Sequence, residues 1–502
     1  MFEIRNLNII QNKQMKVLVD NLSIQFHHGD KVALIGEEGT GKSSVLKILC
    51  GIDVPYVSHT YEFKTENKIV SYVPQHHFDH RSIHDYLLGD FEMMDYAFFY
   101  QLLDGMNIDE ALIDNRPFNT LSGGEKVKIS LIKALLRRPD IIFLDEPTND
   151  LDLDALEYLE TLLREIEIPV VFVSHDIRFI ENIANTIVHF EQIRRRTVSK
   201  VTEYRMDYRE FLSYRQGNID NQNRLAKEQR EAIRLAEEKY ERVHDRVHHE
   251  LNKTKTDTVG KNLKDKMRSV KSVEKRIEKQ KENLTDFVEF EEPINFILLD
   301  SPKMHSSKRL IDIKIDRLMI GNTHLASDIS LQLIGPQRKV IVGDNGSGKS
   351  TLLKEIVKSC EQDQINFAYM PQTYEDIFDK DLTPIEILVD ARDKNAVSKA
   401  MTYLGSLKFT EAEMRQSFKD LSGGQKAKLF FGKMAFEPLE LLIMDEPTRN
   451  ISPLSMETLI ESLKGFNGAI LAVSHDRHLI DSVFEEVYEL KESGLIKIKQ
   501  GI

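Results

Sequence analysis

Residues 32–44 read VALIGEEGTGKSS, and residues 340–351 read VIVGDNGSGKST. In both stretches a short apolar run leads into a glycine-rich loop that ends in Lys and Ser, the order of a P-loop between a strand and a helix. Glycines let backbone N–H groups curl around phosphate oxygens, and the helix that follows turns its positive end toward the same anion. The pattern predicts one phosphate-binding loop in each half of the chain.

These loops supply the first set of expected ligands. Lys42 and Lys349 should reach the β- and γ-phosphates of a nucleotide, and the hydroxyls of Ser43 and Ser350 should bind Mg²⁺. The ATP-binding residues expected here are Gly36, Gly39, Gly41, Lys42, Ser43, Ser44, Gly343, Gly346, Gly348, Lys349, Ser350 and Thr351.

The rest of each half repeats in the same order. LSGGEK at residue 121 returns as LSGGQK at 421, FLDEPT at 143 returns as IMDEPT at 443, and VSHD at 173 returns at 473, each with an offset of 300 residues. VPQ at residue 73 returns as MPQ at 370. A repeat of domain size indicates a tandem duplication rather than a solenoid.

In each half an apolar strand ends in two carboxylates, Asp145 with Glu146 and Asp445 with Glu446. Ligands of parallel α/β sheets lie at the carboxyl ends of the strands. The first acid of each pair suits Mg²⁺, and the second suits the orientation of an attacking water. We therefore expect Glu146 and Glu446 to be catalytic.

Further polar residues follow short strands. His175 and His475 lie in Ser-His-Asp, where neither serine occupies a nucleophile elbow, so a sensor of the γ-phosphate fits better than a hydrolase triad. Both histidines are assigned to catalysis. Gln75 and Gln372 each follow a strand and a proline and suit contacts to metal and water. The expected Mg²⁺ ligands are Ser43, Gln75, Asp145, Ser350, Gln372 and Asp445.

The composition changes between the halves. Residues 221–285 hold 18 Lys and Arg against 12 Asp and Glu, with no Pro, although the net charge of the chain is −13. Apolar residues recur there at three- and four-residue steps, which predicts two long antiparallel helices joined by a short tip. The two expected seams are Ile233, Ala236, Tyr240, Val243 and Val247, and Leu263, Met267, Val270, Val273 and Ile277.

The expected end of this hairpin is basic. Between Leu251 and Lys271, seven Lys and Arg stand against two Asp, a pattern typical of an RNA-facing surface. A solvated charged hairpin that only separates the halves is the alternative. The expected RNA contacts are Lys253, Lys255, Lys261 and Lys264.

Composition also limits the class of protein. The two cysteines, Cys50 and Cys360, cannot form a disulfide framework, which fits a reducing compartment. The start of the chain does not have the pattern of a signal peptide, and its apolar runs are shorter than the ~20 residues that span a bilayer. We expect a soluble, cytoplasmic protein.

LSGGEK and LSGGQK, together with the other repeated motifs, resemble the signature set of ABC ATPases in both halves of the chain. The resemblance implies ATP hydrolysis with Mg²⁺ by a monomer whose two domains pair head to tail. Each ATP is then sandwiched between one P-loop and the other half's signature. The Lys42 site would be completed by Ser422, Gly423 and Gly424, and the Lys349 site by Ser122, Gly123 and Gly124.

Two fused ATPase domains with a long helical linker resemble the ABC-F subfamily, which implies binding at the ribosomal E site with the linker near the P-site tRNA and the rRNA of the peptidyl-transferase centre. From residue 446 the chain reads EPTRNISPLS, similar to EPTRNFSPLS of antibiotic-resistance ABC-F proteins of Gram-positive bacteria. That implies displacement of pleuromutilin, lincosamide or streptogramin A antibiotics. The alternatives are a housekeeping ABC-F factor that rescues stalled ribosomes and, less favoured, the ATPase subunit of a transporter.

The expected fold is therefore α/β: two tandem ABC-type P-loop nucleotide-binding domains joined by a long antiparallel α-helical hairpin. The expected boundaries are 1–204, 205–305 with a tip near 251–262, and 306–502, and no integral membrane partner is required. ABC domains usually stack adenine on an aromatic ring ahead of the P-loop. Here those stretches read LNIIQNK and LMIGNTH, so an apolar face from Ile9, Ile10 or Met319 is expected instead.

Overall fold

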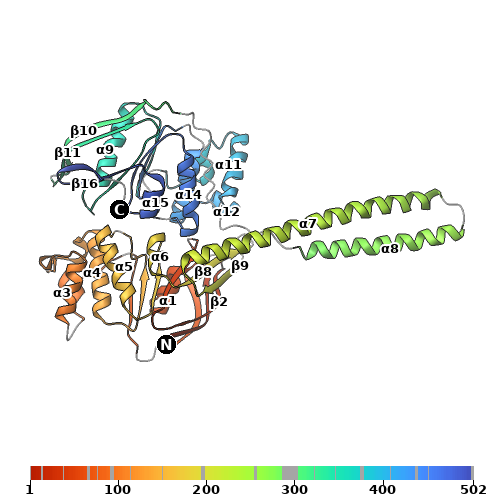
Figure 1. The fold of residues 1–502 in the computed structure, drawn as a ribbon, viewed down its shortest axis with the longest axis horizontal. Helices are drawn as coiled ribbons and strands as arrows, with labels where there is room; N and C mark the ends of the chain where they lie inside the picture. The colour runs from red at the N-terminus through yellow and green to blue at the C-terminus, as the bar shows by residue number, and fades with distance from the viewer. Residues whose placement is uncertain are drawn as a thin grey trace. The chain divides into compact units, whose positions relative to one another are not determined.

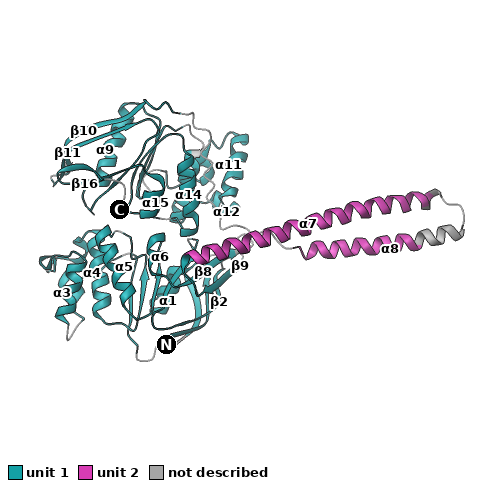
Figure 2. Ribbon diagram, viewed as in Figure 1, with its two compact units in different colours: residues 1–208, 291–502 teal, residues 209–290 magenta. Residues whose placement is uncertain are grey.

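The computed structural model describes residues 2–498 except 13–14, 38, 65–67, 76, 91–94, 114, 150, 194–197, 254–256, 285–303, 322, 345, 373–377, 408, 436–438 and 450. Side chains are also left undescribed at 63–64, 193, 251, 253, 257–264 and 435. The chain forms two compact units, residues 1–208 with 291–502, and residues 209–290 (Figure 2).

The larger unit contains two copies of one α/β arrangement, one from each half of the chain (Figure 1). The first half contains β1 (Phe2–Gln11), β2 (Lys16–Phe26), β3 (Lys31–Gly36), α1 (Lys42–Leu49), β4 (Val57–Lys64), β5 (Val70–Val73), α2 (Ile83–Leu88), α3 (Tyr96–Gly105), 3₁₀ turns at Glu110–Leu112 and Phe118–Thr120, α4 (Gly123–Leu136), β6 (Ile141–Asp145), α5 (Leu153–Glu165), β7 (Val170–Val173), α6 (Ile177–Ile183), β8 (Thr186–Ile193) and β9 (Val198–Tyr204). The second half contains β10 (Arg309–Ile320), β11 (Thr323–Ile334), β12 (Arg338–Val342), α9 (Lys349–Gln362), β13 (Phe367–Met370), α10 (Pro384–Leu388), α11 (Lys394–Ser406), α12 (Glu411–Arg415), a 3₁₀ turn at Phe418–Asp420, α13 (Gly423–Ala435), β14 (Leu441–Asp445), α14 (Pro453–Gly465), β15 (Ala469–Val473), α15 (Arg477–Val483), β16 (Glu486–Lys491) and β17 (Gly494–Ile498).

Each half is built on a six-stranded sheet, in the order β5-β6-β7-β3-β8-β9 or β13-β14-β15-β12-β16-β17. Neighbouring strands are parallel except at the last pair, where β9 and β17 run antiparallel to β8 and β16. Strands β6, β7, β14 and β15 are buried along their whole length, as expected for parallel strands covered on both faces.

The strand order brings the predicted motifs together. In the first half, Gln75 follows β5, Asp145 ends β6, His175 follows β7 by two residues, and the P-loop begins at the end of β3. Because these four strands are adjacent and parallel, their carboxyl ends meet at one edge of the sheet. The second half repeats this arrangement, which confirms the predicted fold of two tandem α/β domains with a long helix between them.

Apolar packing fixes the P-loop helix in place. One cluster in the first half joins Val45, Leu46 and Leu49 of α1 to the antiparallel sheet β2-β1-β4 and to one face of the parallel sheet, including Phe143 of β6. A corresponding cluster surrounds α9 with residues from β10, β11 and the second parallel sheet. The start of each P-loop helix is therefore held against two sheets.

The smaller unit is a helical hairpin of α7 (Tyr208–Lys253) and α8 (Asp257–Glu282). A cross-helix ion pair joins Glu237 Oε1 to Lys281 Nζ at 2.5 Å. No helix among the described residues is both long enough and apolar enough to cross a bilayer.

The apolar seam of the hairpin differs in part from the prediction. Ile233 and Val247 of α7 are buried, as are Val270 and Ile277 of α8, but Val243 is 42% exposed and Val273 is 36% exposed. Ala236, Tyr240 and Met267 are half-buried, and so are His244 and Glu274, so on each helix the seam passes one residue beyond the expected valine. The prediction was wrong at Val243 and Val273.

The side chains expected to contact RNA lie outside the described part of the chain. Lys255 lies outside the described residues, and the side chains of Lys253, Lys261 and Lys264 do as well, together with most of the expected tip at 251–262.

The P-loop glycines give a testable consequence of the fold. Gly36 and Gly39 both have positive φ, but a Cβ on Gly36 would meet the carbonyl oxygen of Phe190 at 2.4 Å, whereas a Cβ on Gly39 would meet nothing within 4 Å. We expect Gly39→Ala to cost about 1–2 kcal/mol through its backbone conformation. Gly36→Ala should cost clearly more, because the β3–β8 contact must also move. Urea unfolding midpoints of the two variants test this, and equal losses would contradict it.

Candidate functional site

Each P-loop lysine folds back over its own loop. Lys42 Nζ donates to the carbonyl oxygens of Gly36 and Glu37 at 2.8 and 2.9 Å, and Lys349 Nζ donates to those of Gly343 and Asp344 at 2.6 and 2.8 Å. Both lysines are only 8% exposed. The two ammonium groups are thus held at the mouth of a glycine loop, where phosphate oxygens bind.

A hydroxyl and a carboxylate lie side by side at the end of β6. Ser43 Oγ donates to Asp145 Oδ1 at 2.8 Å, and Tyr72 Oη donates to Asp145 Oδ2 at 3.1 Å. In the second half, Ser350 likewise hydrogen-bonds Asp445. Burial raises the pKa of Asp145, and the bonds from Ser43 and Tyr72 oppose that rise.

These oxygens fit Mg²⁺. The ion prefers hard oxygen ligands and is usually held by one or two protein groups with phosphate and water completing its shell. The described residues contain no cluster of three or more His, Cys, Asp or Glu that could hold a metal without such help. When bound, Mg²⁺ would neutralise charge on the phosphates, and Ser43 with Asp145, and Ser350 with Asp445, would hold it.

The two glutamates that the sequence predicts to be catalytic are held in a strained backbone conformation. Glu146 and Glu446 have φ values of 54° and 52°, which are costly for residues other than Gly. Their N–H groups donate to the carbonyl oxygens of Val173 and Val473 at 2.9 Å, so each is fixed to the neighbouring strand. This hydrogen bond helps to hold each glutamate in its left-handed conformation directly after β6 or β14.

The switch histidines, His175 and His475, contact these glutamates. The His175 N–H donates to Glu146 Oε2 at 3.1 Å, and the His175 ring Nε2 lies 3.1 Å from Glu146 Oε1. The His475 N–H donates to Glu446 Oε2 at 3.3 Å, but its ring Nε2 lies 3.7 Å from Glu446 Oε1. The two sites therefore share one design and differ in how closely the ring approaches.

The electrostatics of the second site follow from burial. Burial, and then Asp445, raise the pKa of Glu446 above its usual value, while the charge of Lys349 opposes that rise. Burial, and then Lys349, lower the pKa of His475 to about 4. His475 is therefore neutral at pH 7, and its ring can donate one hydrogen bond and accept another.

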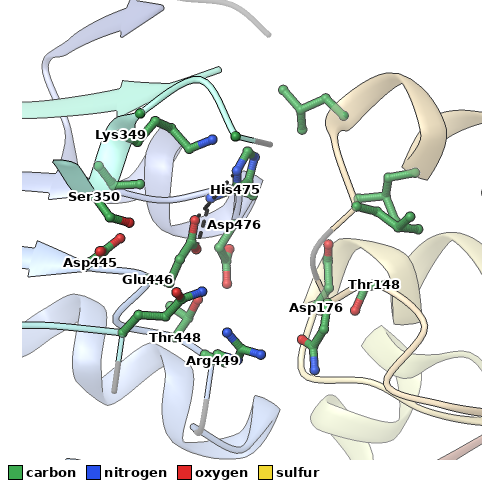
Figure 3. Close-up of a pocket in the computed structure, with 18 of the residues that line it drawn as sticks. Thr148, Asp176, Lys349, Ser350, Asp445, Glu446, Thr448, Arg449, His475 and Asp476 are labelled. Carbon is green, nitrogen blue, oxygen red and sulfur yellow. Dashed lines mark hydrogen bonds and ion pairs between the residues drawn. The ribbon is translucent and has the colours of Figure 1, made fainter. Parts of the chain in front are cut away.

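A cavity of about 360 Å³ opens at this second site (Figure 3). Lys349, Ser350, Asp445, Glu446 and His475 line it, as the sequence predicts for one ATP site. It is also lined by Gly346, Gly348, Thr351 and Gln372.

The opposite wall comes from the first half of the chain. Figure 3 shows Thr148 and Asp176 across the cavity from Lys349, and the residues lining this wall are Thr148, Asn149, Leu151, Leu153, Leu156, His175 and Asp176. Sequence reasoning did not name this segment as a wall of the second site. The D-loop, the segment after the DEPT strand, was the available signal, but only the folded domains show which site it faces.

The signature residues do not line this cavity. Ser122 caps α4 and exchanges hydrogen bonds with Glu125, and Ser422 exchanges them with Gln425 at the start of α13. Gly123, Gly124, Gly423 and Gly424 open the same two helices. The completion of each site by the other half's signature therefore stays a prediction.

The halves do make a direct contact through a switch histidine. His175 Nδ1 lies 2.6 Å from the carbonyl oxygen of Ile451, in the D-loop of the second half. The described residues provide no equivalent hydrogen bond to the His475 ring nitrogens.

The apolar residues that could contact the adenine differ in part from those that the sequence predicts. Ile320 and Leu325 line the cavity, next to the expected Met319, which is 43% exposed. In the first half Ile9 is fully buried in the core, which leaves Ile10 as the expected residue on that side. Ile9 was wrong because it lies on the face of the sheet β2-β1-β4 that packs into the core around α1.

A family model described as ABC transporter matches residues 19–149 and 326–449, half of the chain. The chain belongs to this family. It is an ATP hydrolase with two ABC ATPase domains, and such domains bind ATP.

Two relatives match most of this chain, and one of them is named as an F family member. The ATP-binding protein Uup of Buchnera aphidicola is 26% identical, with 95% of this chain and 79% of the relative covered. ABC transporter F family member 2 of Arabidopsis thaliana is 26% identical, with 98% and 77% covered. The similarity to an F family member over 98% of this chain agrees with the predicted resemblance to ABC-F proteins.

A solved structure shares the fold of this ABC protein. The archaeal ribosome recycling factor aABCE1, crystallised with the ribosomal stalk protein aP1, matches with a TM-score of 0.62 and 17% identity. The match covers 99% of this chain and 91% of that chain.

The lowered pKa of His475 gives a pH prediction. The unfolded ring takes up a proton near pH 6.5, whereas the folded ring does so only near pH 4. The stability that depends on neutral His475 should therefore be complete above pH 6.5 and decline as the pH falls toward 4. His475→Gln should remove this part of the acid dependence, measured as urea midpoints from pH 4 to 7. If the urea midpoints of variant and native protein fell equally as the pH is lowered, His475 would not be the group responsible.

Proposed function

We propose that this ABC-F ATPase binds the ribosome at the E site and uses its hairpin to act near the P-site tRNA and the peptidyl-transferase centre. The observation that carries the proposal is the separate helical unit at residues 209–290, which lies in the sequence between the two ATPase domains. Within this unit, residues 251–271 have a net charge of +5. A basic end on a chain of net charge −13 suits a polyanionic partner. A protein of the same fold, aABCE1, is named as a ribosome recycling factor.

ATP would control this binding. Two ATPs would draw the halves together, with each P-loop closed by the signature of the other half, and the closed form would bind the ribosome. Glu146 and Glu446 would orient the attacking water, and the switch histidines would hold the γ-phosphate. Hydrolysis would reopen the halves and release the protein.

We propose that the hairpin displaces antibiotics of the pleuromutilin, lincosamide or streptogramin A class. The EPTRNISPLS segment supports this, because Ser452 stands in the second D-loop where the first half has Asp152. The build of the first domain also supports it: 46 positions separate Gln75 from Leu121 and 49 separate Gln372 from Leu421, which leaves no room for an extra arm in one half only.

A housekeeping role in rescuing stalled ribosomes is the second candidate, and the F-type relatives are equally compatible with it. Drug-susceptibility testing after deletion and restoration of the gene separates the two. Resistance that disappears and returns with the gene supports drug displacement. Unchanged susceptibility with slowed growth supports the housekeeping role.

The cellular setting follows from the same proposal. The protein would act in the cytoplasm as a monomer, with its two domains pairing within one chain. Sedimentation with ribosomes rather than with membranes is the expected outcome, and sedimentation with membranes would favour a transporter subunit.

Replacing both catalytic glutamates should trap the ribosome complex. Glu146→Gln with Glu446→Gln removes the groups that orient water, so hydrolysis should fall about 100-fold or more while ATP still binds. With ATP, the variant should pellet with ribosomes through a sucrose cushion, and with ADP it should not.

Glu157→Gln with Glu457→Gln is the matched control. These glutamates lie at equivalent positions on α5 and α14, and their replacement removes the same charge as the catalytic double substitution. The control should cycle as the native protein does. A catalytic double variant that leaves ribosomes at the native rate would rule the mechanism out.

A further inference from the structure

A buried ion pair joins the two ATPase halves. Arg477, the first residue of α15 in the second half, donates through Nη2 to Glu160 Oε1 on α5 of the first half. Arg477 is 8% exposed and Glu160 is 3% exposed. Two charges that are removed from water this far must be compensated by each other and by further hydrogen bonds.

Glu160 has those further bonds. Its Oε2 accepts from Asn182 Nδ2 at 2.8 Å and from Arg164 Nη2 at 3.4 Å, both in the first half. The carboxylate therefore has partners within its own half in addition to Arg477. Arg477 is its partner from the second half.

The repeat does not provide a second copy of this ion pair. The 300-residue offset of the repeat maps Glu160 to Ile460 and Arg477 to Ile177. Ile460 and Ile177 are buried as well, at 2% and 5% exposed. One seam between the halves therefore contains an ion pair, while the equivalent positions of the other seam are apolar.

Arg477 directly follows the switch turn of the second half, residues 474–476. It also reaches the switch turn of the first half, residues 174–176, with Nη2 at 3.9 Å from Asp176 Oδ2. Asp176 and Asp476 both line the ATP cavity. Burial, and then Asp476, raise the pKa of Asp176 to about 6, so Arg477 lies where two carboxylates repel each other.

The switch turn of the first half has a different tether. His175 Nδ1 contacts the Ile451 carbonyl of the second half at 2.6 Å, whereas neither ring nitrogen of His475 has a hydrogen-bond partner among the described residues. In the second half, the buried cross-half hydrogen bond of Arg477 lies one residue beyond Asp476, and a second, more exposed pair joins Arg178 to Asp481 on the same helix.

We propose that Arg477 and Glu160 are positioning residues that hold the switch turn of the second half in place, so that ATP binding at the Lys349 site depends on a contact that the Lys42 site does not use. The proposal goes beyond ATP hydrolysis, because it assigns to the Lys349 site a stabilising contact that the Lys42 site lacks.

Photolabelling separates the two sites. The Glu146→Gln, Glu446→Gln protein is labelled with an azido-ATP, and labelled P-loop peptides from each half are quantified by mass spectrometry. Adding Arg477→Ile should reduce labelling of the second P-loop about tenfold, equivalent to ~1.4 kcal/mol. Labelling of the first P-loop should change less than about twofold, within the scatter of unrelated substitutions.

Two further variants guard against simple loss of folding. Glu160→Gln keeps the shape of the acceptor and should reduce second-site labelling in the same way, and Arg477→Lys should restore part of it because the charge is kept. Arg178→Ala is the matched control and should leave both labels unchanged, because the ion pair of Arg178 with Asp481 between α6 and α15 is partly exposed to solvent. Equal loss at both sites, or no loss at either, would overturn the proposal.

Discussion

Burial of acidic groups at the ends of parallel strands is the constraint on which both ATP sites depend. Asp145 is fully buried, Glu146 is 4% exposed, and Asp445 is 3% exposed. Such groups are stable only where donors or cations meet them. The sheet order provides these partners, because it places the P-loop serine, the switch-turn amide and the P-loop lysine at the ends of adjacent strands. Much of the remaining structure, including the clamping of α1 between two sheets, holds these partners in place.

The same constraint explains why the site tolerates strain. The positive φ of Glu146 and Glu446 costs free energy in the folded protein, and a bond from each N–H to the neighbouring strand holds that conformation. The raised pKa of Glu446 shows that burial acts on the carboxylate as well. A group held with a high pKa and a fixed direction is ready to respond when cationic charge enters the site.

Local motifs carried most of the fold and most of the site. The repeated P-loops, the apolar strands ending in Asp-Glu and the Ser-His-Asp turns each depend on residues close in sequence, and they predicted the two sheets and the residues lining one side of the cavity. Features that depend on packing between distant segments were missed or misplaced. Val243 follows the helical period but faces solvent, Ile9 faces the core, and the pairing of Arg477 with Glu160 requires knowledge of how α5 and α15 meet.

The one-way ion pair has a consequence for how the halves recognise each other. Two copies of the first half, paired with each other in the same manner, would bring Glu160 opposite Ile177 and leave an acid buried beside hydrocarbon. Two copies of the second half would leave Arg477 opposite Ile460. Each such homodimer would contain unmatched buried charge at both seams, whereas pairing within the chain contains none at these positions. The ion pair therefore favours pairing of the first half with the second half. If the halves were expressed separately, it would favour their heterodimer over either homodimer.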